Sequence, residues 1–298
     1  MNKTQISILL PTYNCSCKEL VRSLQQQCAD RVEYEIIVAD DGSTEKQWIE
    51  ENRVIESWPH VRYLVRQENV GRAAIRNFLA RQAQYPWLLF IDGDISLDNP
   101  HFIQNYEKSR GEVVVGGLTI GGDPRRWRNN LRYRYEKDCE QAHNAESRQA
   151  KAHQEFRTTN FLIHRDILLQ HPFDENFRYY GYEDVLFGKE LQNSGVTIQH
   201  INNPVLLDNY ENNILFLQKT EEALRTLYTF RRQLSGYSTL LRCTERLERL
   251  KMLSLVNFSY KITAKGIKQQ LQGNNPKVFL FTIYKLMYFV HLIKQHQS

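Results

Sequence analysis

The 298-residue sequence has few cysteines, and their spacing is not that of a scaffold. No C-x-x-C pair occurs, and the odd total rules out complete internal pairing. This argues against a disulfide framework or a zinc module and predicts reduced thiols in a cytoplasmic protein. The five cysteines are Cys15, Cys17, Cys28, Cys139 and Cys243.

Long hydrophobic runs, internal repeats and low-complexity linkers are also lacking. Residues 1–5 are polar and Ile6–Leu10 is too short for the apolar part of a secretory leader, so we expect none. The strongly apolar stretch Val278–Ile293 is interrupted by polar residues and falls short of the roughly 20 residues of a membrane span. With 41% hydrophobic residues, the chain can form one large α/β domain plus an appendage.

The most informative segment that is present is a buried strand ending in two carboxylates. Leu88–Ile91 is entirely apolar, typical of a strand covered on both faces, and Asp92-Gly93-Asp94 follows it. Ligands of open α/β sheets bind outside the carboxyl ends of the strands. Paired carboxylates at that place favour a hard divalent cation carrying substrate phosphates. The alternative is a surface turn, in which Asp-Gly is common.

Two other apolar strands also end in polar residues. Glu35–Asp41 ends in paired aspartates, and Ile6–Tyr13 ends in a turn rich in hydrogen-bonding groups. Strands that alternate with helical segments predict a mostly parallel sheet flanked by helices, so these ends would line one crevice. The helical segments lie at 19–28, 45–57 and 71–84.

Six motifs occur in order along the chain. They are PTYN at Pro11–Asn14, DDGS at Asp40–Ser43, Asn69–Asn77, DGD at Asp92–Asp94, Phe173–Phe177 and Gly181–Asp184. The set resembles glycosyltransferase family 2, the inverting nucleotide-sugar enzymes of the GT-A fold. The last motif is similar to the glycine-plus-Glu-Asp motif near the acceptor site, also found in galactosyltransferase-like relatives.

The resemblance covers about residues 5–205 and implies a fold and a division of the chain. The fold is α/β of GT-A type, with a C-terminal helical extension. The catalytic domain would span 1–208, with a nucleotide-binding half at about 1–115 and an acceptor-binding half at about 116–208. The extension would span 209–298.

The resemblance also implies which residues bind the donor. A strand-end carboxylate such as Asp41 can accept hydrogen bonds from ribose hydroxyls or a base N–H, although it could instead cap the next helix. Arg72 and Arg76 share one helical face and suit diphosphate oxygens, with a solvated face as the alternative. The implied donor-binding residues are Pro11, Thr12, Tyr13, Asp40, Asp41, Arg72, Arg76, Asp92 and Gly93.

Mn²⁺ or Mg²⁺ is the implied cofactor, with Asp94 as direct ligand and Asp92 beside it. Such ions are usually held by substrate phosphates and one or two carboxylates, and they stabilise charge on a leaving diphosphate. His200 is the nearest candidate for a third ligand, although a lone histidine is often structural. Many relatives carry a histidine where this sequence has Leu207, which leaves Asp208 as the alternative oxygen ligand.

Asp184 and Glu183 are the predicted catalytic pair. Asp184 would act as general base on the acceptor hydroxyl, an effect typically worth 10²–10⁴-fold. Glu183 and Tyr182 would orient the acceptor, and Asn160 would contact sugar hydroxyls. The alternative is that the acidic pair only complements the dipole of the helix predicted over 184–193.

These residues predict an inverting, metal-dependent glycosyltransferase. It would move a sugar from a nucleotide-sugar, with a UDP-sugar as the expected donor, to a saccharide or lipid-linked saccharide in polysaccharide synthesis. One alternative is a non-catalytic sugar-nucleotide-binding subunit of a polysaccharide assembly, which would not need Asp184. The other is a sugar-phosphate nucleotidyltransferase, which would need a glycine-rich loop where the sequence has PTYNCSCKE.

The chain beyond Thr239 is strongly basic. It carries ten Lys or Arg and two acids, a net +8 against +5 for the whole chain. With the aromatic-rich Val278–Ile293, this predicts peripheral attachment to the anionic inner face of the cell membrane. Packing of an amphipathic helix on its own domain or on a dimer partner is the alternative. Arg125–Tyr135 interleaves arginines with aromatics, but no other nucleic-acid motif occurs, so we expect a helical lid there and no nucleic-acid partner.

Overall fold

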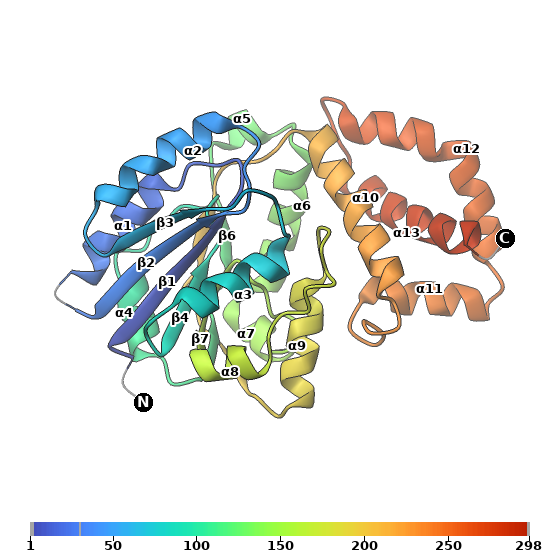
Figure 1. Ribbon diagram of the computed structural model, residues 1–298. Helices are drawn as coiled ribbons and strands as arrows, with labels where there is room; N and C mark the ends of the chain where they lie inside the picture. Colours follow the sequence, from blue (N-terminus) through green and yellow to red (C-terminus); the bar gives the residue numbers. More distant parts are fainter. Residues whose placement is uncertain (1–2, 30, 297–298) are drawn as a thin grey trace.

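The computed structural model describes residues 3–29 and 31–296. Figure 1 shows a central sheet between layers of helices, with a group of helices at the C-terminal end. The strands are β1 (Gln5–Thr12), β2 (Glu33–Asp40), β3 (Val61–Val65), β4 (Trp87–Ile91), β5 (Val113–Val115), β6 (Leu118–Ile120), β7 (Asn160–His164), β8 (Ile198–His200) and β9 (Val205–Leu207).

The first helices of the sheet-containing part match the segments expected from the sequence: α1 (Lys18–Cys28), α2 (Lys46–Arg53) with η1 (Val54–Ser57), and α3 (Arg72–Gln82). The other helices of this part are α4 (Phe102–Lys108), α5 (Pro124–Trp127), α6 (Leu131–Cys139), η2 (Glu140–His143), α7 (Ala145–Gln149), α8 (Arg165–Gln170) and α9 (Glu183–Asn193). The C-terminal helices are α10 (Asn213–Thr229), α11 (Thr239–Arg249), α12 (Leu253–Gln272) and α13 (Val278–Gln295).

The sheet has seven strands in the order β3-β2-β1-β4-β7-β5-β8. The pairs β3–β2, β2–β1 and β1–β4 are parallel, whereas β7 is antiparallel to β4 and β5. Strand β1 lies between β2 and β4, and Thr12 pairs with Asp40. The carboxyl ends of these three strands therefore meet at one edge, as the sequence pattern predicted, and the α/β fold class is confirmed.

Two apolar cores cover the two faces of the sheet. Because side chains alternate along a strand, Ile8 enters one core and Leu9 the other. Helices α1 and α4 pack on the first face, and α3, α8 and α9 pack on the second. Strand β4 is buried along its whole length, which agrees with its continuous apolar sequence. The five cysteines are free thiols, as predicted.

Helix α13 is a core element of the C-terminal helices. Phe281, Tyr284, Phe289 and Val290 are at most 1% exposed and pack against α10, α11 and α12. Phe279 and Ile283 of the same helix are 63% and 43% exposed, so contact of Val278–Ile293 with a membrane stays a prediction. Across residues 3–29 and 31–296, no helix combines the length and the hydropathy that crossing a bilayer requires.

Helix α10 connects the sheet-containing part to the other C-terminal helices (Figure 1). Its first residue, Asn213, accepts a hydrogen bond from Leu131 N at 2.7 Å and donates to the Asn129 carbonyl at 3.0 Å. The division at 208/209 stays a prediction, as does the division of the catalytic part at 115/116. Packing of α10 against α6 ties the two sides of the first boundary together.

Candidate active site

A cavity of about 290 Å³ opens at the edge where β1, β2 and β4 end. Its walls come from three strand ends, the start of α3, the loop before α9, and α10. The lining residues are Pro11, Thr12, Tyr13, Cys15, Asp41, Asn69, Gly71, Arg72, Ile75, Arg76, Asp92, Gly93, Asp94, Arg178, Tyr179, Tyr180, Lys219 and Glu222. Eight of the nine predicted donor-binding residues thus line one cavity.

The end of β1 packs tightly against the Asp-Gly-Asp motif. Gly93 N donates to the Pro11 carbonyl at 3.1 Å. A Cβ atom at Gly93 would lie 2.5 Å from the Thr12 Cγ2 atom, so only glycine allows this approach. Thr12 Oγ1 is buried and has no protein partner in the described structure. This hydroxyl is a hydrogen-bonding group left over for a ligand in the cavity.

Asp41 braces the turn that leads into α3. Its Oδ1 accepts from Val70 N and its Oδ2 from Gly71 N, each at 3.1 Å. Burial raises the pKa of Asp41, and these two hydrogen bonds oppose that shift. Gly71 has φ +91°, and a Cβ there would lie 2.5 Å from the Arg178 carbonyl oxygen. Asp41 therefore lines the cavity and also shapes it, rather than capping α2, for which no side-chain cap bond is found.

Asp40 lies behind the cavity wall. Its Oδ1 accepts from Ser43 N and its Oδ2 from Ser43 Oγ, both at 2.7 Å, and the Tyr63 hydroxyl also donates to Oδ2 at 3.2 Å. Asp40 is 1% exposed and is not among the residues lining the cavity. The predicted direct contact of Asp40 with the donor is therefore corrected to support of the Asp40–Ser43 turn.

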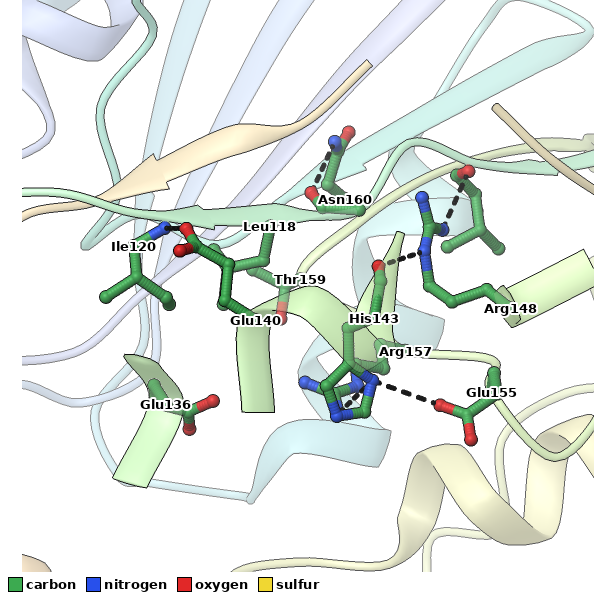
Figure 2. Close-up of a pocket in the computed structure, with 12 residues that line it drawn as sticks. Leu118, Ile120, Glu136, Glu140, His143, Arg148, Glu155, Arg157, Thr159 and Asn160 are labelled. Atoms are coloured by element: carbon green, nitrogen blue, oxygen red, sulfur yellow. Dashed lines mark hydrogen bonds and ion pairs between the residues drawn. The ribbon is translucent and has the colours of Figure 1, made fainter. Parts of the chain in front are cut away.

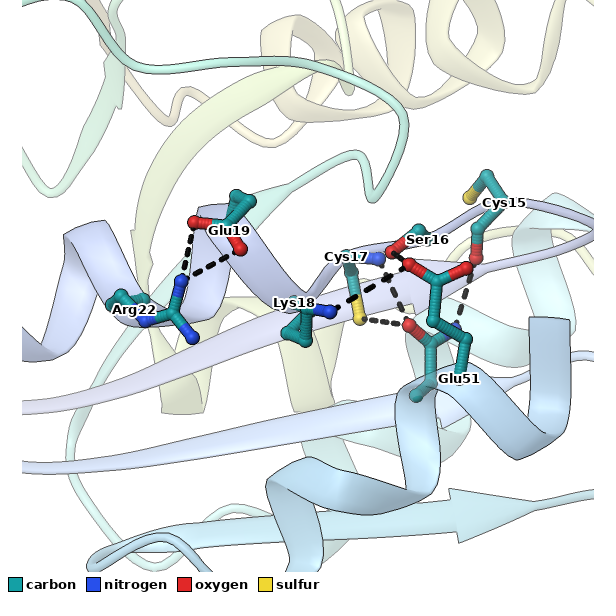
Figure 3. Close-up of polar contacts among 8 residues, drawn as sticks. Cys15, Ser16, Cys17, Lys18, Glu19, Arg22 and Glu51 are labelled. Carbon is teal, nitrogen blue, oxygen red and sulfur yellow. Dashed lines mark hydrogen bonds and ion pairs between the residues drawn. The ribbon is translucent and has the colours of Figure 1, made fainter.

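The loop after β1 is held in place by α2. Figure 3 shows Ser16 and Lys18 beside Glu51 of α2: Ser16 Oγ donates to Glu51 at 2.7 Å, and Lys18 Nζ lies 4.0 Å from the same carboxylate. Asn52 is fully buried, accepts from Cys17 N at 3.0 Å and donates to the Cys15 carbonyl at 2.9 Å. These bonds fix the position of Tyr13 and Cys15 at the mouth of the cavity.

A buried arginine joins the Asp-Gly-Asp motif to the start of α9. Arg76 is 1% exposed, and its guanidinium lies 2.6 Å from Asp92 Oδ1 and 3.6 Å from Glu183 Oε1. The alternative of a solvated helix face is excluded for Arg76. Removing one partner from such a buried ionic set typically costs about 3–5 kcal/mol. Glu183 is itself 4% exposed, so its predicted contact with an acceptor hydroxyl is corrected to a positioning role.

Asp94 differs from Asp92 in being exposed at the cavity rim. It also lines an adjoining hollow of about 480 Å³, which Asp208 lines from the end of β9. Asp208 Oδ2 accepts from Ser96 Oγ at 3.0 Å, which fixes it beside the Asp-Gly-Asp loop. Within residues 3–29 and 31–296, no three His, Cys, Asp or Glu side chains are close enough to hold a metal by themselves.

His200 is not a metal ligand in this arrangement. Its Nδ1 lies 2.7 Å from the Arg148 guanidinium and its Nε2 lies 2.9 Å from the Ala152 carbonyl. Because arginine can only donate, Nδ1 is the acceptor and the proton sits on Nε2. Burial, reinforced by the Arg148 charge, lowers the pKa of His200 to about 4. The predicted role of His200 is therefore wrong, because both ring nitrogens serve the packing of β8.

Asn160 is also structural. Its Oδ1 accepts from the Tyr106 hydroxyl at 2.6 Å, and its Nδ2 donates to the Asn203 and Gly117 carbonyls. Figure 2 shows Asn160 at the edge of a second cavity. His143, Glu155 and Arg157 form a polar cluster that lines the same cavity. That cavity measures about 20 Å³, too small for a sugar ring. The predicted contact of Asn160 with sugar hydroxyls is corrected, because its amide is already engaged.

Asp184 is the second residue of α9, which begins directly after a strained residue. Tyr182 adopts a left-handed backbone with φ +70°, which is unusual for an aromatic side chain and typical of functional sites. Asp184 is half-buried, and burial, followed by the adjacent Glu183 carboxylate, raises its pKa to about 6. A carboxylate with a pKa in that range suits a general base. Neither Tyr182 nor Asp184 is among the residues lining the 290 Å³ cavity, so their roles stay predictions.

Three charged residues of the cavity were not predicted from the sequence. Lys219 and Glu222 come from α10, and Arg178 comes from the loop before α9. Glu222 Oε1 accepts from Tyr180 N at 3.0 Å, while the Tyr180 ring lies 4.6 Å from the Arg72 guanidinium. The sequence predicted a helical extension over 209–298 but gave no signal of which helix face would line the cavity.

This sheet, with its carboxylate-bearing strand ends, defines a GT-A nucleotide-sugar transferase fold. The sequence pattern of glycosyl transferase family 2 matches residues 7–171, and the chain belongs to this family. That match ends before Glu183, so it does not test the predicted Glu-Asp motif.

Curated relatives match part of this chain. A chondroitin synthase of Escherichia coli is 41% identical over 106 residues, which is 34% of this chain and 15% of that protein. A poly(ribitol-phosphate) beta-glucosyltransferase of Bacillus spizizenii is 28% identical over 120 residues, 38% of this chain and 19% of that protein. The matches therefore span less than half the length of these relatives.

Solved structures share the fold over nearly the whole chain. A Pyrobaculum calidifontis mannosyltransferase, solved with GDP-Man and Mn²⁺, superposes with a TM-score of 0.58 at 14% identity and covers 98% of this chain and 86% of that one. TarS of S. aureus, residues 1–349, solved with UDP-GlcNAc, has a TM-score of 0.51 at 14% identity. The superposition covers 99% of this chain and 92% of that one. At this identity the likeness shows the fold.

Proposed function

We propose that this protein is an inverting, metal-dependent glycosyltransferase that moves a sugar from a nucleotide-sugar donor to a saccharide or lipid-linked saccharide. The convergence of Thr12, Asp41, Arg72 and Asp94 on one cavity carries the proposal. A nucleotide, a diphosphate and a cation each find a complementary group there: a hydroxyl and a carboxylate, a guanidinium, and an exposed carboxylate.

The donor lies along the cavity with its base toward β1 and β2. Tyr13, 45% exposed, offers an aromatic face to the base, and the unpartnered Thr12 hydroxyl offers a hydrogen bond. Arg72 and Lys219 place positive charge beside the diphosphate. The UDP-GlcNAc complex of TarS supports a uridine donor, and the GDP-Man complex of the mannosyltransferase is the competing precedent.

The carboxylates present fit a divalent cation of the Mn²⁺ or Mg²⁺ type. Asp94 would hold it directly, and Asp208 in the adjoining hollow is the second oxygen donor. Asp92 is less suited, because Arg76 already neutralises it at 2.6 Å. When bound, such an ion stabilises negative charge on the departing diphosphate as a Lewis acid.

Asp184 removes the proton from the acceptor hydroxyl. The hydroxyl oxygen forms its bond to the anomeric carbon as the bond to the diphosphate oxygen breaks, which inverts the configuration. Arg76 supports this step by holding Glu183, the residue before Asp184, against Asp92. The Asp-Gly-Asp motif at the donor cavity and the general base Asp184 are thereby fixed relative to each other.

A donor screen tests the proposal. The purified protein is incubated with UDP-sugars and GDP-sugars in the presence of Mn²⁺, and released nucleoside diphosphate is measured. We expect release from at least one UDP-sugar and its loss on addition of EDTA. Release from none of the nucleotide-sugars, with and without saccharide acceptors, would contradict an enzymatic role and favour a non-catalytic binding subunit.

Lys219 offers a test of the contribution of α10. Its side chain is 37% exposed and paired with Glu211 at 3.2 Å while lining the cavity. Lys219→Met removes a charge-assisted contact to phosphate and should raise the donor KM roughly tenfold. Lys137→Met is the control, because Lys137 is similarly exposed and paired with Glu140 on α6. Equal KM values for wild type and Lys219→Met would remove α10 from the donor site.

A further inference from the structure

Helix α12 presents an apolar stripe to solvent. Leu255, Phe258 and Ile262 are 59%, 62% and 65% exposed. Spacings of three and four residues place them on one side of the helix. The opposite side, with Leu253 and Leu271, is buried. In Figure 1, α12 lies at the outer edge of the C-terminal helices with α13 on its inner side, so the stripe points away from the protein.

The charged side chains of α12 and of the four residues before it are all basic. Lys261 and Lys265 lie on the helix, Lys251 lies two residues before its start, and all three are exposed. No Asp or Glu follows Glu248 in the sequence, so the last 50 residues contain basic side chains and no acidic ones. An exposed apolar strip whose charged neighbours on the helix are lysines is the composition of a helix that lies in a membrane interface.

We propose that the α12 face, made of Lys251, Leu255, Phe258, Lys261, Ile262 and Lys265, docks on an anionic lipid bilayer. This inference goes beyond the proposed function and does not depend on it. The charge pattern selects the occupant. A second copy packed on this face would bring like-charged lysines together, whereas anionic headgroups would neutralise them while the apolar side chains enter the acyl boundary.

The proposal differs from the prediction made from the sequence in which helix touches lipid. Large side chains of α13 such as Phe281 and Tyr284 are buried in the core, although Phe279 and Ile283 are exposed. On α12, Leu255, Phe258 and Ile262 form a continuous exposed stripe. Two contributions should be separable. Each lysine near the surface strengthens binding roughly fivefold at low salt, and salt screens that contribution. The apolar contribution is insensitive to salt.

Vesicle flotation of the full-length protein tests the proposal. We compare vesicles of phosphatidylcholine alone with vesicles containing equal parts phosphatidylcholine and phosphatidylglycerol, at low and high salt. The protein should float with the anionic vesicles at low salt, less so at high salt, and weakly with neutral vesicles. Failure to float with anionic vesicles at low salt would overturn the proposal.

Two sets of variants assign the binding to α12. Leu255→Ser, Phe258→Ser and Ile262→Ser combined should lower the affinity for anionic vesicles at least about tenfold, and Lys251→Gln, Lys261→Gln and Lys265→Gln combined should abolish the salt dependence. Control variants Val54→Ser with Leu169→Ser, and Lys46→Gln with Lys108→Gln and Lys151→Gln, change exposed residues of the same kinds elsewhere. Because the altered side chains are exposed, circular dichroism should show intact folding.

Three outcomes would count against the α12 face. Vesicle binding unchanged by both sets of variants would place the contact elsewhere. An equal loss of vesicle binding in the control variants would mean that binding depends on the overall charge and hydrophobicity of the protein and not on the α12 face. A change in the sedimentation coefficient of the serine variant, with vesicle binding retained, would make a second copy of the chain the occupant.

Discussion

Asp184→Asn is expected to lower kcat by 10²–10⁴-fold, the range typical of a lost general base. Donor affinity should stay at the wild-type value, because Asp184 is not among the residues lining the donor cavity. The asparagine has almost the same shape and removes a half-buried charge whose pKa burial has raised, so the melting temperature should not fall. Steady-state kinetics together with calorimetric titration of the donor measure these quantities.

The pH profile gives a second readout of the same residue. Burial and the Glu183 charge raise the pKa of Asp184 to about 6. A general base works when deprotonated, so wild-type kcat/KM should fall with a slope of one below about pH 6. The residual activity of Asp184→Asn should lack that inflection.

Asp166→Asn is the matched control for Asp184. Asp166 is an exposed first-turn acid of α8. Its replacement removes a helix-dipole interaction of about 0.3–1 kcal/mol and an exposed contact with His164 at 3.8 Å. Turnover of Asp184→Asn close to wild type would reduce Asp184 to the same dipole role. A loss of donor affinity as large as the loss of kcat would move Asp184 into the donor site.

Asp94→Asn is expected to have the second large effect. The exposed carboxylate of Asp94 is the proposed direct ligand of Mn²⁺, and its loss should abolish the gain in donor affinity that Mn²⁺ provides. Titration of a UDP-sugar into wild type with EDTA and into Asp94→Asn with Mn²⁺ should therefore give similar weak affinities. Turnover should fall with them.

Asp98→Asn controls for general loss of negative charge in this loop. Asp98 is exposed and lies four residues after Asp94. Its replacement should leave the response to Mn²⁺ intact. If wild type binds and turns over the donor equally well with EDTA and with Mn²⁺, the metal part of the proposal fails while the nucleotide part stands.

The sequence predicted the architecture and the donor crevice for a physical reason. Apolar strands such as Leu88–Ile91 can be covered only by helices on both faces, and parallel strands bring their carboxyl ends to one edge. The sequence pattern therefore predicts that strand-end residues such as Thr12, Asp41 and Asp94 lie close together. Arg76 was predicted to face the ligand, and its ion pairs with Asp92 and Glu183 place it at the cavity wall.

Roles that depend on packing between distant segments could not be predicted. His200 and Asn160 were assigned to the site by residue type. In the folded protein the polar side-chain atoms of each form hydrogen bonds with other protein groups and are not available to a ligand. Lys219 lines the cavity because α10 packs beside the sheet edge, and no local motif encodes that contact. In the C-terminal part, composition predicted a basic, apolar region, but only the fold shows which apolar side chains of α12 and α13 are buried and which are exposed.

The most direct test of the central claim is a crystal structure of the protein with UDP and Mn²⁺, using the anomalous scattering of manganese to locate the ion. The account predicts uridine density between Tyr13 and Asp41 and an anomalous peak beside the Asp94 carboxylate. A nucleotide bound away from this cavity, or a manganese peak that is not in contact with Asp94, would contradict it.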